Sequence, residues 1–314
     1  MRKLLAVASF AILLVFPTSP FAWWDGGHMQ IAALAYEKLT PQARARVDAL
    51  VKLNPDYQDW IGCLPADQKE KLAFMRASVW ADDIKTDAQH TDPDDKPDGP
   101  NAGRNIGYSD MLRHKYWHYM DIGFSTDGAP VRPADPVNAL TQIRMFRSAL
   151  AASSGVSDAV RSYDLVWLLH LVADVHQPLH ATARFTQSLP SGDNGGNKVL
   201  VRPATGEIIQ LHFYWDRMFG GYTTAEGAVR DAHDHDGLAQ VPVDQELAAI
   251  DDPEIWIKQS YEAARKFAYA EPVLSGMQPI ELTRQYETEA RNAARVQAAL
   301  AAERLARLLN AVLQ

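Results

Sequence analysis

Apolar residues recur at helical spacing along most of the chain. Across residues 165–171 they are almost continuous, which predicts a buried helix over residues 157–175. Residues 136–153 carry their apolar positions on one face and predict an amphipathic helix. The same reasoning predicts helices over residues 28–39, 41–53, 67–79, 243–250, 253–270 and 281–313.

Local signals refine two of these helices. Thr40 before Pro41 is the pair of residues expected where a helix begins, because the Thr side chain caps it and Pro suits its first turn. The last helix is expected to face the core through a regularly spaced stripe, which consists of Leu282, Tyr286, Ala293, Val296, Leu300, Leu305 and Leu308.

Only one region has a strand pattern. Residues 199–201 and 208–211 are apolar stretches separated by a turn signal, which predicts a β-hairpin. Residues 54–65 and 86–107 are rich in Pro, Gly and Asp and are predicted to be loops. Since no internal repeat and no linker is visible, the prediction is one all-α domain, mainly α-helical, with one small β-hairpin.

The first 22 residues have the pattern of a secretory signal peptide. Arg2 and Lys3 precede an apolar run too short to span a bilayer comfortably, and a cleavage position follows after Ala22. The expected mature domain therefore begins at Trp23 and covers residues 23–314. No other stretch is apolar enough to cross a membrane, so we expect a secreted or periplasmic monomer without stable membrane association.

Cysteine content and net charge limit what can stabilise the fold and what can attract a substrate. Cys63 is the only cysteine, so no intrachain disulfide can form, and an exported fold then needs a large core or metal cross-links. Removing residues 1–22 changes the formal net charge from −8 to −10. A nonspecific duplex binder is usually basic, so an anionic substrate would have to be attracted locally, for example by bound metal ions.

Histidine and aspartate recur at a spacing that suits metal binding. His170 and Asp174 are four residues apart in the predicted central helix and therefore share a face. Pro178 ends that helix, which lets His180 return toward the same region. His212 and Asp216 repeat the four-residue spacing. Neutral imidazoles and carboxylates suit zinc, although a core histidine paired with an aspartate remains an alternative for any one pair.

More residues of the same kind lie in apolar or aromatic surroundings elsewhere in the chain. The full candidate set is His28, Asp82, His118, His170, Asp174, His180, His212 and Asp216. This set exceeds the needs of one ion, and two or three neighbouring ions suit the cleavage of phosphoesters. His176 faces away from this set and is expected to be structural. Two polar runs are expected to be solvated: His233 and His235 lie in a charged run, and the acidic loop of residues 86–107 lacks EF-hand spacing for calcium.

The motifs around these residues resemble those of the zinc-dependent, single-strand-specific nucleases of fungi, plants and bacteria (nuclease type I), which are grouped with bacterial zinc phospholipases C. The similarity extends from Trp23 to Asn310. It rests on Trp-x4-His, Trp-Ala-Asp, His-Tyr-x-Asp, His-x3-Asp-x2-Gln-Pro-Leu-His, Gly-Gly-Asn and Leu-His-x3-Asp. Fungal and plant members carry disulfides that this chain lacks.

The resemblance implies three zinc ions. One would be held by Asp82, His118, His170 and Asp174. Another would be held by His180, His212 and Asp216. The third would take the α-amine and carbonyl of Trp23 together with His28 and a bridging Asp174, which would explain why a mature chain begins at Trp23.

The resemblance also implies roles in catalysis and substrate binding. Asp82 and Asp174 would hold the reacting metal ions, and Lys85 would stabilise the transition state. Tyr119 and Asp121 match residues that stack on and hydrogen-bond an unpaired base, and Asn197 would orient ligands or phosphate. From the residues alone, each role has an alternative. These are an ordinary exposed lysine for Lys85, core packing for Tyr119, support of His118 for Asp121, and a purely structural turn for Asn197.

Three functions compete at this stage. The first is an endonuclease and 3′-nucleotidase that cleaves single-stranded DNA, RNA and 3′-nucleotides to 5′-phosphate and nucleoside products. The second is a phospholipase C, but that branch closes its metal set with glutamate where this chain has Asp216. The third is a periplasmic zinc-binding protein without enzymatic activity, for which dispersed ligands are atypical.

Overall fold

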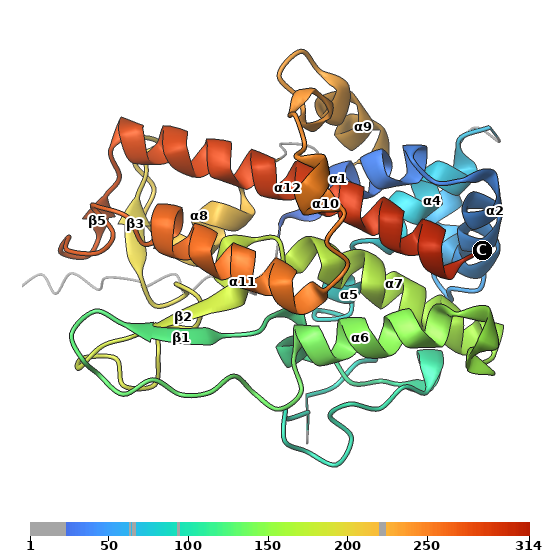
Figure 1. The fold of residues 1–314 in the computed structure, drawn as a ribbon, viewed down its shortest axis with the longest axis horizontal. Helices are drawn as coiled ribbons and strands as arrows, with labels where there is room; N and C mark the ends of the chain where they lie inside the picture. The colour runs from blue at the N-terminus through green and yellow to red at the C-terminus, as the bar shows by residue number, and fades with distance from the viewer. Residues whose placement is uncertain (1–22, 63, 65–66, 93–94, 220–223) are drawn as a thin grey trace, which may run out of the picture.

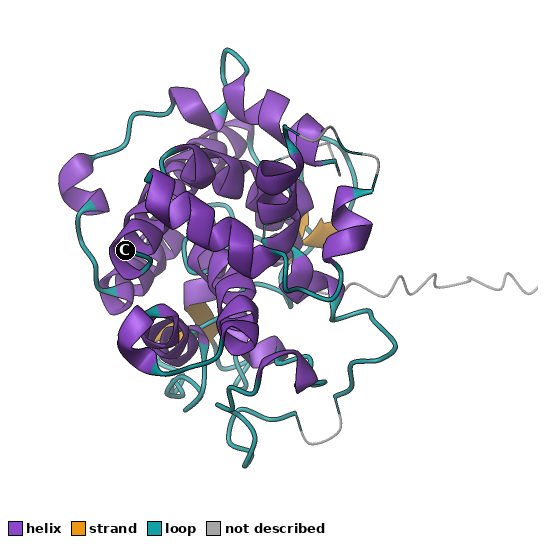
Figure 2. Cartoon of the chain, turned by 90° about the vertical axis from the view of Figure 1, so that its right-hand side faces the viewer, coloured by secondary structure: helices purple, strands orange, loops and turns teal. Residues whose placement is uncertain are grey.

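The computed structural model describes residues 23–62, 64, 67–92, 95–219 and 224–314. The expected signal peptide and Cys63 lie outside the described residues. Helices dominate the described chain, and its strands are few and short (Figures 1 and 2). The prediction of a mainly α-helical fold is confirmed. Within these ranges every helix is either too short or too polar to cross a membrane.

The helices follow one another from α1 to α12. Their bounds are α1 (Asp25–Glu37), α2 (Pro41–Val51), α3 (Tyr57–Ile61), α4 (Lys69–Ala77), α5 (Trp80–Asp83), α6 (Ala139–Leu150), α7 (Asp158–Asp174), α8 (Leu211–Asp216), α9 (Ala225–His233), α10 (Gln245–Ala248), α11 (Pro253–Ala263) and α12 (Arg284–Val312). Short 3₁₀ turns at Lys115–His118 and Pro178–Ala181 matter for the site, and a π-helical turn, Ala264–Ala268, continues α11.

Helix α7 is the centre of the fold, as its apolar run predicts. The Ser157 side chain caps its first turn, and every residue from Ser162 to Asp174 is buried. The helix contacts α2, α5, α6 and α12 (Figure 1). The predicted cap of α2 is also present, with the Thr40 hydroxyl accepting the Ala43 N–H at 3.2 Å.

The strands form two small sheets. The predicted hairpin is present as β3 (Leu200–Arg202) antiparallel to β4 (Ile209–Gln210), and β5 (Ile280–Glu281) pairs parallel with β3. A second, unpredicted pair joins β1 (Ile122–Ser125) and β2 (Thr182–Phe185) in parallel. This pair brings two distant segments together just before their strands begin, where the Met120 N–H donates to the His180 carbonyl at 2.9 Å.

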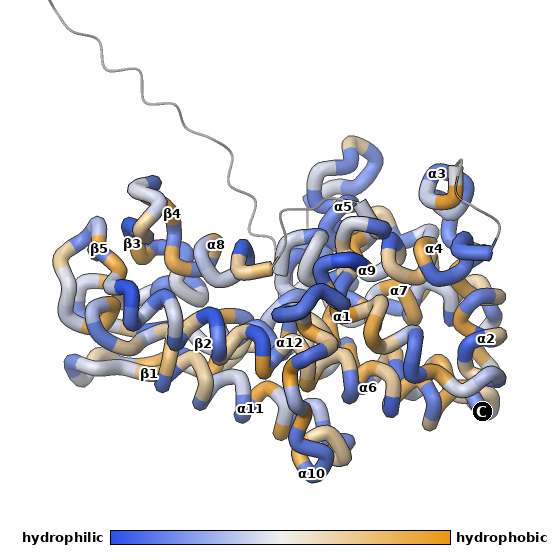
Figure 3. The backbone as a smooth tube through the Cα atoms, turned by 90° about the horizontal axis from the view of Figure 1, so that it is seen from above, coloured by the Kyte–Doolittle hydropathy of each residue, from blue (hydrophilic) through white to orange (hydrophobic). Residues whose placement is uncertain are grey.

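Two large hydrophobic clusters form most of the core. One is built around α2, α4, α6 and α7, and the other around β3, α8 and the π-helical turn. Helix α12 spans both, since Leu305 and Leu308 belong to the first and Ala290 and Ala298 to the second; apolar stretches of these helices alternate with polar ones in Figure 3. The predicted stripe of α12 is wrong at Val296, which is 53% exposed.

Three loop assignments need correction or refinement. Residues 54–65 contain α3, because Tyr57 is buried and Trp60 packs against the core. Helix α9 was not predicted, and it includes the start of the charged run that contains His233. The acidic loop is tied down by ion pairs, since Asp92 contacts both Arg113 (3.0 Å) and Lys115 (2.9 Å).

Candidate metal centre

Histidines and aspartates from six separate segments gather in one buried region. His28 comes from α1, Asp82 from α5, and His170 and Asp174 from α7. The two 3₁₀ turns and α8 supply the rest, namely His118, His180, His212 and Asp216. All eight are at most 5% exposed. They form three overlapping or adjacent groups that could hold a metal ion.

Asp174 belongs to one of these groups, with His118 and His170, and also contacts His28 of another. Its Oδ2 is 2.9 Å from His118 Nδ1 and 3.2 Å from His170 Nε2, and its Oδ1 is 3.3 Å from His28 Nε2. Asp82 adds a second carboxylate, with Oδ1 3.5 Å from His170 Nε2. One carboxylate that reaches three imidazoles is placed to bridge neighbouring ions.

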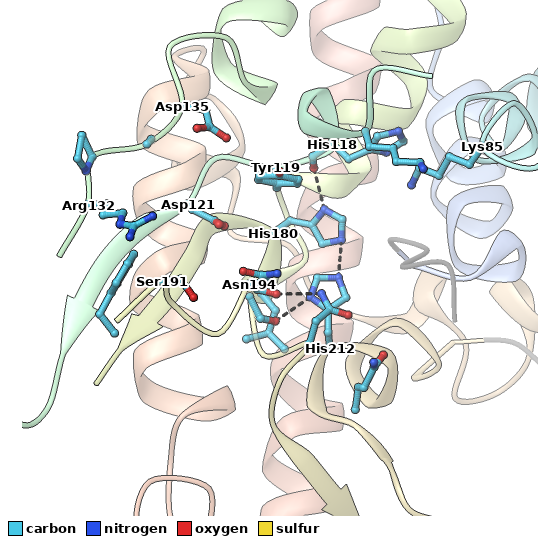
Figure 4. Close-up of a pocket in the computed structure, with 18 residues that line it drawn as sticks. Lys85, His118, Tyr119, Asp121, Arg132, Asp135, His180, Ser191, Asn194 and His212 are labelled. Carbon is cyan, nitrogen blue, oxygen red and sulfur yellow. Dashed lines mark hydrogen bonds between the residues drawn. The ribbon is translucent and has the colours of Figure 1, made fainter. Parts of the chain in front are cut away.

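The group of His180, His212 and Asp216 is joined to the group that contains His118 through a backbone carbonyl. His180 donates its Nδ1–H to the His118 carbonyl at 2.7 Å. Its Nε2 is 3.1 Å from His212 Nε2, and His212 Nε2 is 3.5 Å from Asp216 Oδ2. Figure 4 shows His118, His180 and His212 as a continuous row along one wall of a cleft.

The hydrogen bonds of His180 and His212 fix which ring nitrogen carries the proton, and they leave the two Nε2 acceptors facing each other. His212, like His180, donates its Nδ1–H to a carbonyl, that of Gly195 at 2.7 Å. A neutral imidazole that donates through Nδ1 has only a lone pair at Nε2. The two Nε2 atoms, 3.1 Å apart, are then both acceptors and repel unless a cation lies beside them.

Protonation does not provide that cation. Burial, together with the neighbouring His180, lowers the pKa of His212 to about 3. Burial, together with the charge of Lys85, also lowers the pKa of His118 to about 3. Both rings are therefore neutral at ordinary pH, which is the state in which imidazole binds a metal.

Several buried polar atoms of the same residues have no hydrogen-bond partner within the described chain. They are His28 Nδ1 and Nε2, Asp82 Oδ2, His118 Nε2, Asp174 Oδ1 and Asp216 Oδ2. A purely structural network satisfies its buried polar atoms, because each one left unpaired costs about 1–3 kcal/mol. Unpaired nitrogens and carboxylate oxygens that converge are the donor set of zinc, so these residues fit such an ion.

Neighbouring groups orient the candidate ligands. His170 donates its Nδ1–H to the Ser78 carbonyl at 2.7 Å, which aims Nε2 at the two carboxylates. Gln177 Nε2 donates to Asp216 Oδ1 at 2.7 Å. Gly195, whose carbonyl holds His212, has φ +59° and no room for a Cβ, which would lie 2.4 Å from the Leu179 carbonyl oxygen.

Sequence reasoning did not single out these supporting residues. The only sequence signal for a supporting role of Gln177 and Gly195 is that they lie inside the Gln-Pro-Leu-His and Gly-Gly-Asn motifs. Ser78 acts through its backbone carbonyl and has no sequence signal. The Gly-Gly-Asn turn is now explained by its glycine carbonyl, which orients His212.

Trp23 is buried beside the same region. Its indole Nε1 donates to the carbonyl of Ala173 at 3.1 Å, next to Asp174 in the chain. The backbone N–H of the following residue, Trp24, donates to the Asp216 carbonyl at 3.0 Å. The start of the described chain is therefore fixed between two of the candidate ligands, while coordination by the Trp23 backbone stays a prediction.

A cleft of about 520 Å³ opens onto the row of histidines. Basic, aromatic and polar side chains line it, including Lys85, Lys115, Tyr119, Asp121, Arg132, Ser191, Asn194 and Asn197 (Figure 4). Lys85 Nζ is 2.6 Å from Asp82 Oδ1, so its charge lies at the edge of the candidate metal centre. An anion that enters the cleft therefore meets positive charge in an otherwise acidic protein.

The residues expected to bind a base lie at one end of this cleft. Tyr119 follows His118 directly and is half-buried. Burial raises the pKa of Asp121 to about 8, with repulsion from Asp193 and Asp135 adding to it. Its carboxyl is then protonated at neutral pH and can both donate and accept a hydrogen bond. Asn197 uses its side-chain amide to donate to the Asn194 carbonyl at 2.9 Å, within the turn itself.

Two other histidine sites are separate from this centre. The exposed group Asp234, His235 and Asp236 is the only one of the candidate groups in the described residues that is not buried. His176 donates to the Val172 carbonyl and accepts from Arg304 Nη1, both through short contacts of 2.7 and 2.9 Å. It ties α7 to α12, in agreement with the expected structural role.

Comparison with known proteins identifies the family. The sequence profile described as S1/P1 nuclease matches residues 23–314, a range that contains every described residue. A comparison with curated proteins found no match. The profile, the mainly helical fold and the buried histidine and aspartate groups agree with one another, and zinc dependence is general in this family. The chain therefore belongs to the S1/P1 nuclease family and is a hydrolase that acts on the phosphodiester bonds of nucleic acids.

Proposed function

We propose that the chain is an exported, trinuclear zinc enzyme that cleaves single-stranded DNA and RNA and removes the 3′-phosphate of 3′-nucleotides. The observation that carries this proposal is the cluster of unpaired, buried histidine and aspartate atoms beside a cleft that Lys85, Lys115 and Arg132 help to line. Export after removal of residues 1–22 and a single domain over residues 23–314 are part of the same proposal.

The proposed ligands divide into three sets. Asp82, His118, His170 and Asp174 form one, and His180, His212 and Asp216 form another. The third consists of the α-amine and carbonyl of Trp23 with His28 and Asp174. The short distances from Asp174 to His28, His118 and His170 support its role as the bridge.

When bound, zinc supplies a Lewis acid that lowers the pKa of water and offsets the charge of a phosphodiester. The protein's own part is to place the groups around the reacting phosphate. Lys85, only 7% exposed, contributes a positive charge that can stabilise the additional negative charge of the transition state. Its contact with Asp82 keeps the ammonium group at the edge of the cleft.

Tyr119 and Asp121 would select the form of the substrate. A half-buried phenol ring can stack on any base, and stacking needs a base that is not paired. The protonated carboxyl of Asp121 can hydrogen-bond the edge of that base. Bases inside a duplex are not accessible to such a pocket unless they are flipped out.

The proposal is tested by a comparison of substrates. Purified protein that begins at Trp23 is expected to cleave single-stranded DNA and RNA at least about 10-fold faster than blunt duplex DNA of the same length, since one base stack is worth about 1–3 kcal/mol. It should release phosphate from 3′-nucleotides and show little activity on phosphatidylcholine. Equal rates on single strands and duplexes would contradict the base pocket, and faster hydrolysis of phosphatidylcholine would favour the phospholipase alternative.

Zinc is also expected to stabilise the fold, because its proposed ligands come from six segments and no disulfide can replace it. An ion bound about 100-fold above its Kd contributes roughly 2.7 kcal/mol. Chelation should therefore lower Tm by roughly 5–10 °C per ion lost, at about 2–4 °C per kcal/mol. Calorimetry with and without chelator measures the shift, and re-addition of zinc should reverse it. An unchanged Tm after confirmed loss of metal would contradict this role.

A further inference from the structure

A small aromatic and cationic surface lies next to the candidate metal centre. The Trp24 and Phe213 rings pack edge to face with centroids 5.5 Å apart. The Arg217 guanidinium lies over both, 5.4 Å from the Trp24 ring and 5.1 Å from the Phe213 ring. We call Trp24, Phe213 and Arg217 the α8 platform, since Phe213 belongs to that helix and Arg217 is its C-cap residue.

Core packing does not account for the α8 platform. Trp24 is half-buried and belongs to neither of the two large hydrophobic clusters of the described chain, whereas Phe213 only borders one of them. Among the described residues, the Trp24 ring contacts the Phe213 ring and the Arg217 guanidinium. A large indole that contacts another ring and a cation, but no core cluster, is typical of a surface that binds a ligand.

The platform is attached directly to the candidate metal centre. Phe213 follows His212, and Arg217 follows Asp216. Adjacent residues of a helix differ by about 100° in direction, so both side chains lie on the same side of the face that carries the two ligands. The Trp24 N–H donates to the Asp216 carbonyl at 3.0 Å, which fixes the remaining member beside the same turn of helix.

The platform adjoins one terminal member of the row of histidines and the Tyr119 pocket adjoins the other, and the platform residues lie outside the lining of the cleft itself. Tyr119 directly follows His118, the first member of the row, and Phe213 directly follows His212, the last. The contacts from His118 to His180 and from His180 to His212 set this order (Figure 4). A nucleic-acid strand whose phosphate lies over the row would extend toward both ends.

We propose that the α8 platform stacks the base of the nucleotide on the 3′ side of the bond that is cleaved. This proposal rests on the proposed function, in which Tyr119 and Asp121 hold an unpaired base. Because the base of a 3′-nucleotide lies on the 5′ side of its phosphate, we assign that pocket to the base on the 5′ side of the bond. An indole stacks on any unpaired base, and the guanidinium adds cation–π attraction and positive charge for the neighbouring phosphate. Arg217 is held in place by Glu207, with Nη1 2.8 Å from Oε2.

The platform would distinguish a strand from a mononucleotide. A 3′-nucleotide has no base on the 3′ side of its phosphate and cannot use this surface. An oligonucleotide uses both ends of the row, so its kcat/KM should depend on Trp24. Because stacking tolerates all four bases, the platform should improve binding without imposing a sequence.

The test uses single-stranded oligonucleotides with one cleavable bond, carrying either a base or an abasic sugar on its 3′ side. For the protein that begins at Trp23, the abasic substrate should have kcat/KM about 10-fold lower, within the range expected for one stacked base. Trp24→Ala should lose about the same factor on the normal substrate and no further factor on the abasic one. Trp24→Phe, which keeps a ring, should recover most of the loss.

Three controls separate stacking from damage to the metal centre. Trp24→Ala should keep its zinc content and its hydrolysis of a 3′-nucleotide, which need the same ions but not the platform. Trp60→Ala removes another half-buried indole, on α3, and should leave both substrates unaffected. Circular dichroism and Tm measured on every variant report any loss of fold.

The possible failures are distinguishable. If Trp24→Ala lowers hydrolysis of the 3′-nucleotide and the oligonucleotide equally, or if the abasic penalty persists in this variant, the platform does not stack the base. If the unaltered protein cleaves single strands but is indifferent to the abasic sugar, the platform proposal alone is overturned. If it cleaves no single-stranded substrate, the proposed function itself fails.

Discussion

Asp174→Asn is expected to reduce cleavage of single-stranded DNA by more than about 100-fold, because even residues that only support metal ligands contribute roughly 10- to 100-fold. The substitution keeps the size of the side chain but removes the charge that three histidines share. Asp174 lies within 3.3 Å of His28, His118 and His170, so its loss affects two of the three proposed ions. Zinc content should fall together with kcat.

Asp164→Asn is the matched control. Asp164 lies on the same helix, is equally buried and is contacted by Asn105 Nδ2 at 3.0 Å rather than by any candidate ligand. Burial raises the pKa of its carboxyl to about 7, so the neutral amide is a mild replacement. Asp164→Asn should keep its zinc and its activity. Asp174→Asn with near-normal cleavage would show that the carboxylate is not at the reacting centre.

Addition of one residue before Trp23 is expected to reduce the rate of single-stranded DNA cleavage by about 100-fold or more. Loss of a residue that only supports a metal ligand costs roughly 10- to 100-fold, and here a proposed ligand itself is lost. The α-amine can donate a lone pair to zinc, whereas the amide nitrogen that replaces it in an extended chain is a poor ligand. His28 and Asp174 would remain, and two side chains hold an ion less firmly than four donor atoms. The effect is measured as the zinc content and the cleavage rate of the mature and Met-extended proteins, after mass spectrometry has confirmed the N-terminus of each.

The control for this experiment has to preserve the packing of the buried Trp23 side chain. Trp23 packs in the core and donates its Nε1–H to the Ala173 carbonyl, so Trp23→Ala should cost stability on the order of 3–5 kcal/mol. Trp23→Phe keeps the ring as well as the amine and carbonyl. It should therefore be much more active than the extended protein. An extended protein that retains full activity and all its zinc would exclude the backbone of Trp23 as a ligand.

Elements with a strong local pattern could be predicted from the sequence. Helix α7 was predicted within one residue at each end, because a nearly continuous apolar run and a Ser cap specify it. The four-residue spacing placed His170 beside Asp174 and His212 near Asp216, and both pairs are close in the structure. The hairpin of β3 and β4 likewise follows from its turn and flanking apolar residues.

Contacts between distant segments could not be predicted in this way. The parallel pair β1 and β2 joins residues about 60 positions apart, and no local pattern encodes its register. The carbonyls that orient His170 and His212 belong to Ser78 and Gly195, whose side chains do not participate. The short helix α3 forms where its aromatic residues pack on the core, which overrides the loop-like composition around it.

The platform illustrates a third kind of limit. Trp24, Phe213 and Arg217 are each adjacent in sequence to a proposed ligand. The four-residue spacing of Phe213 and Arg217 indicates that these two share a face, but nothing in the sequence indicates that Trp24 joins them. Their association depends on the Trp24 N–H reaching the Asp216 carbonyl across nearly 200 residues of chain. A surface of this kind is visible only after the fold is known.

The central claim is that the buried histidine and aspartate groups hold zinc for phosphodiester hydrolysis. Elemental analysis of the purified protein that begins at Trp23, after gel filtration, tests it most directly. Three zinc ions per chain are predicted, with cleavage of single-stranded DNA lost as they are removed and restored as they return. One zinc or fewer per chain, in protein that still cleaves single-stranded DNA at its full rate, would contradict the account.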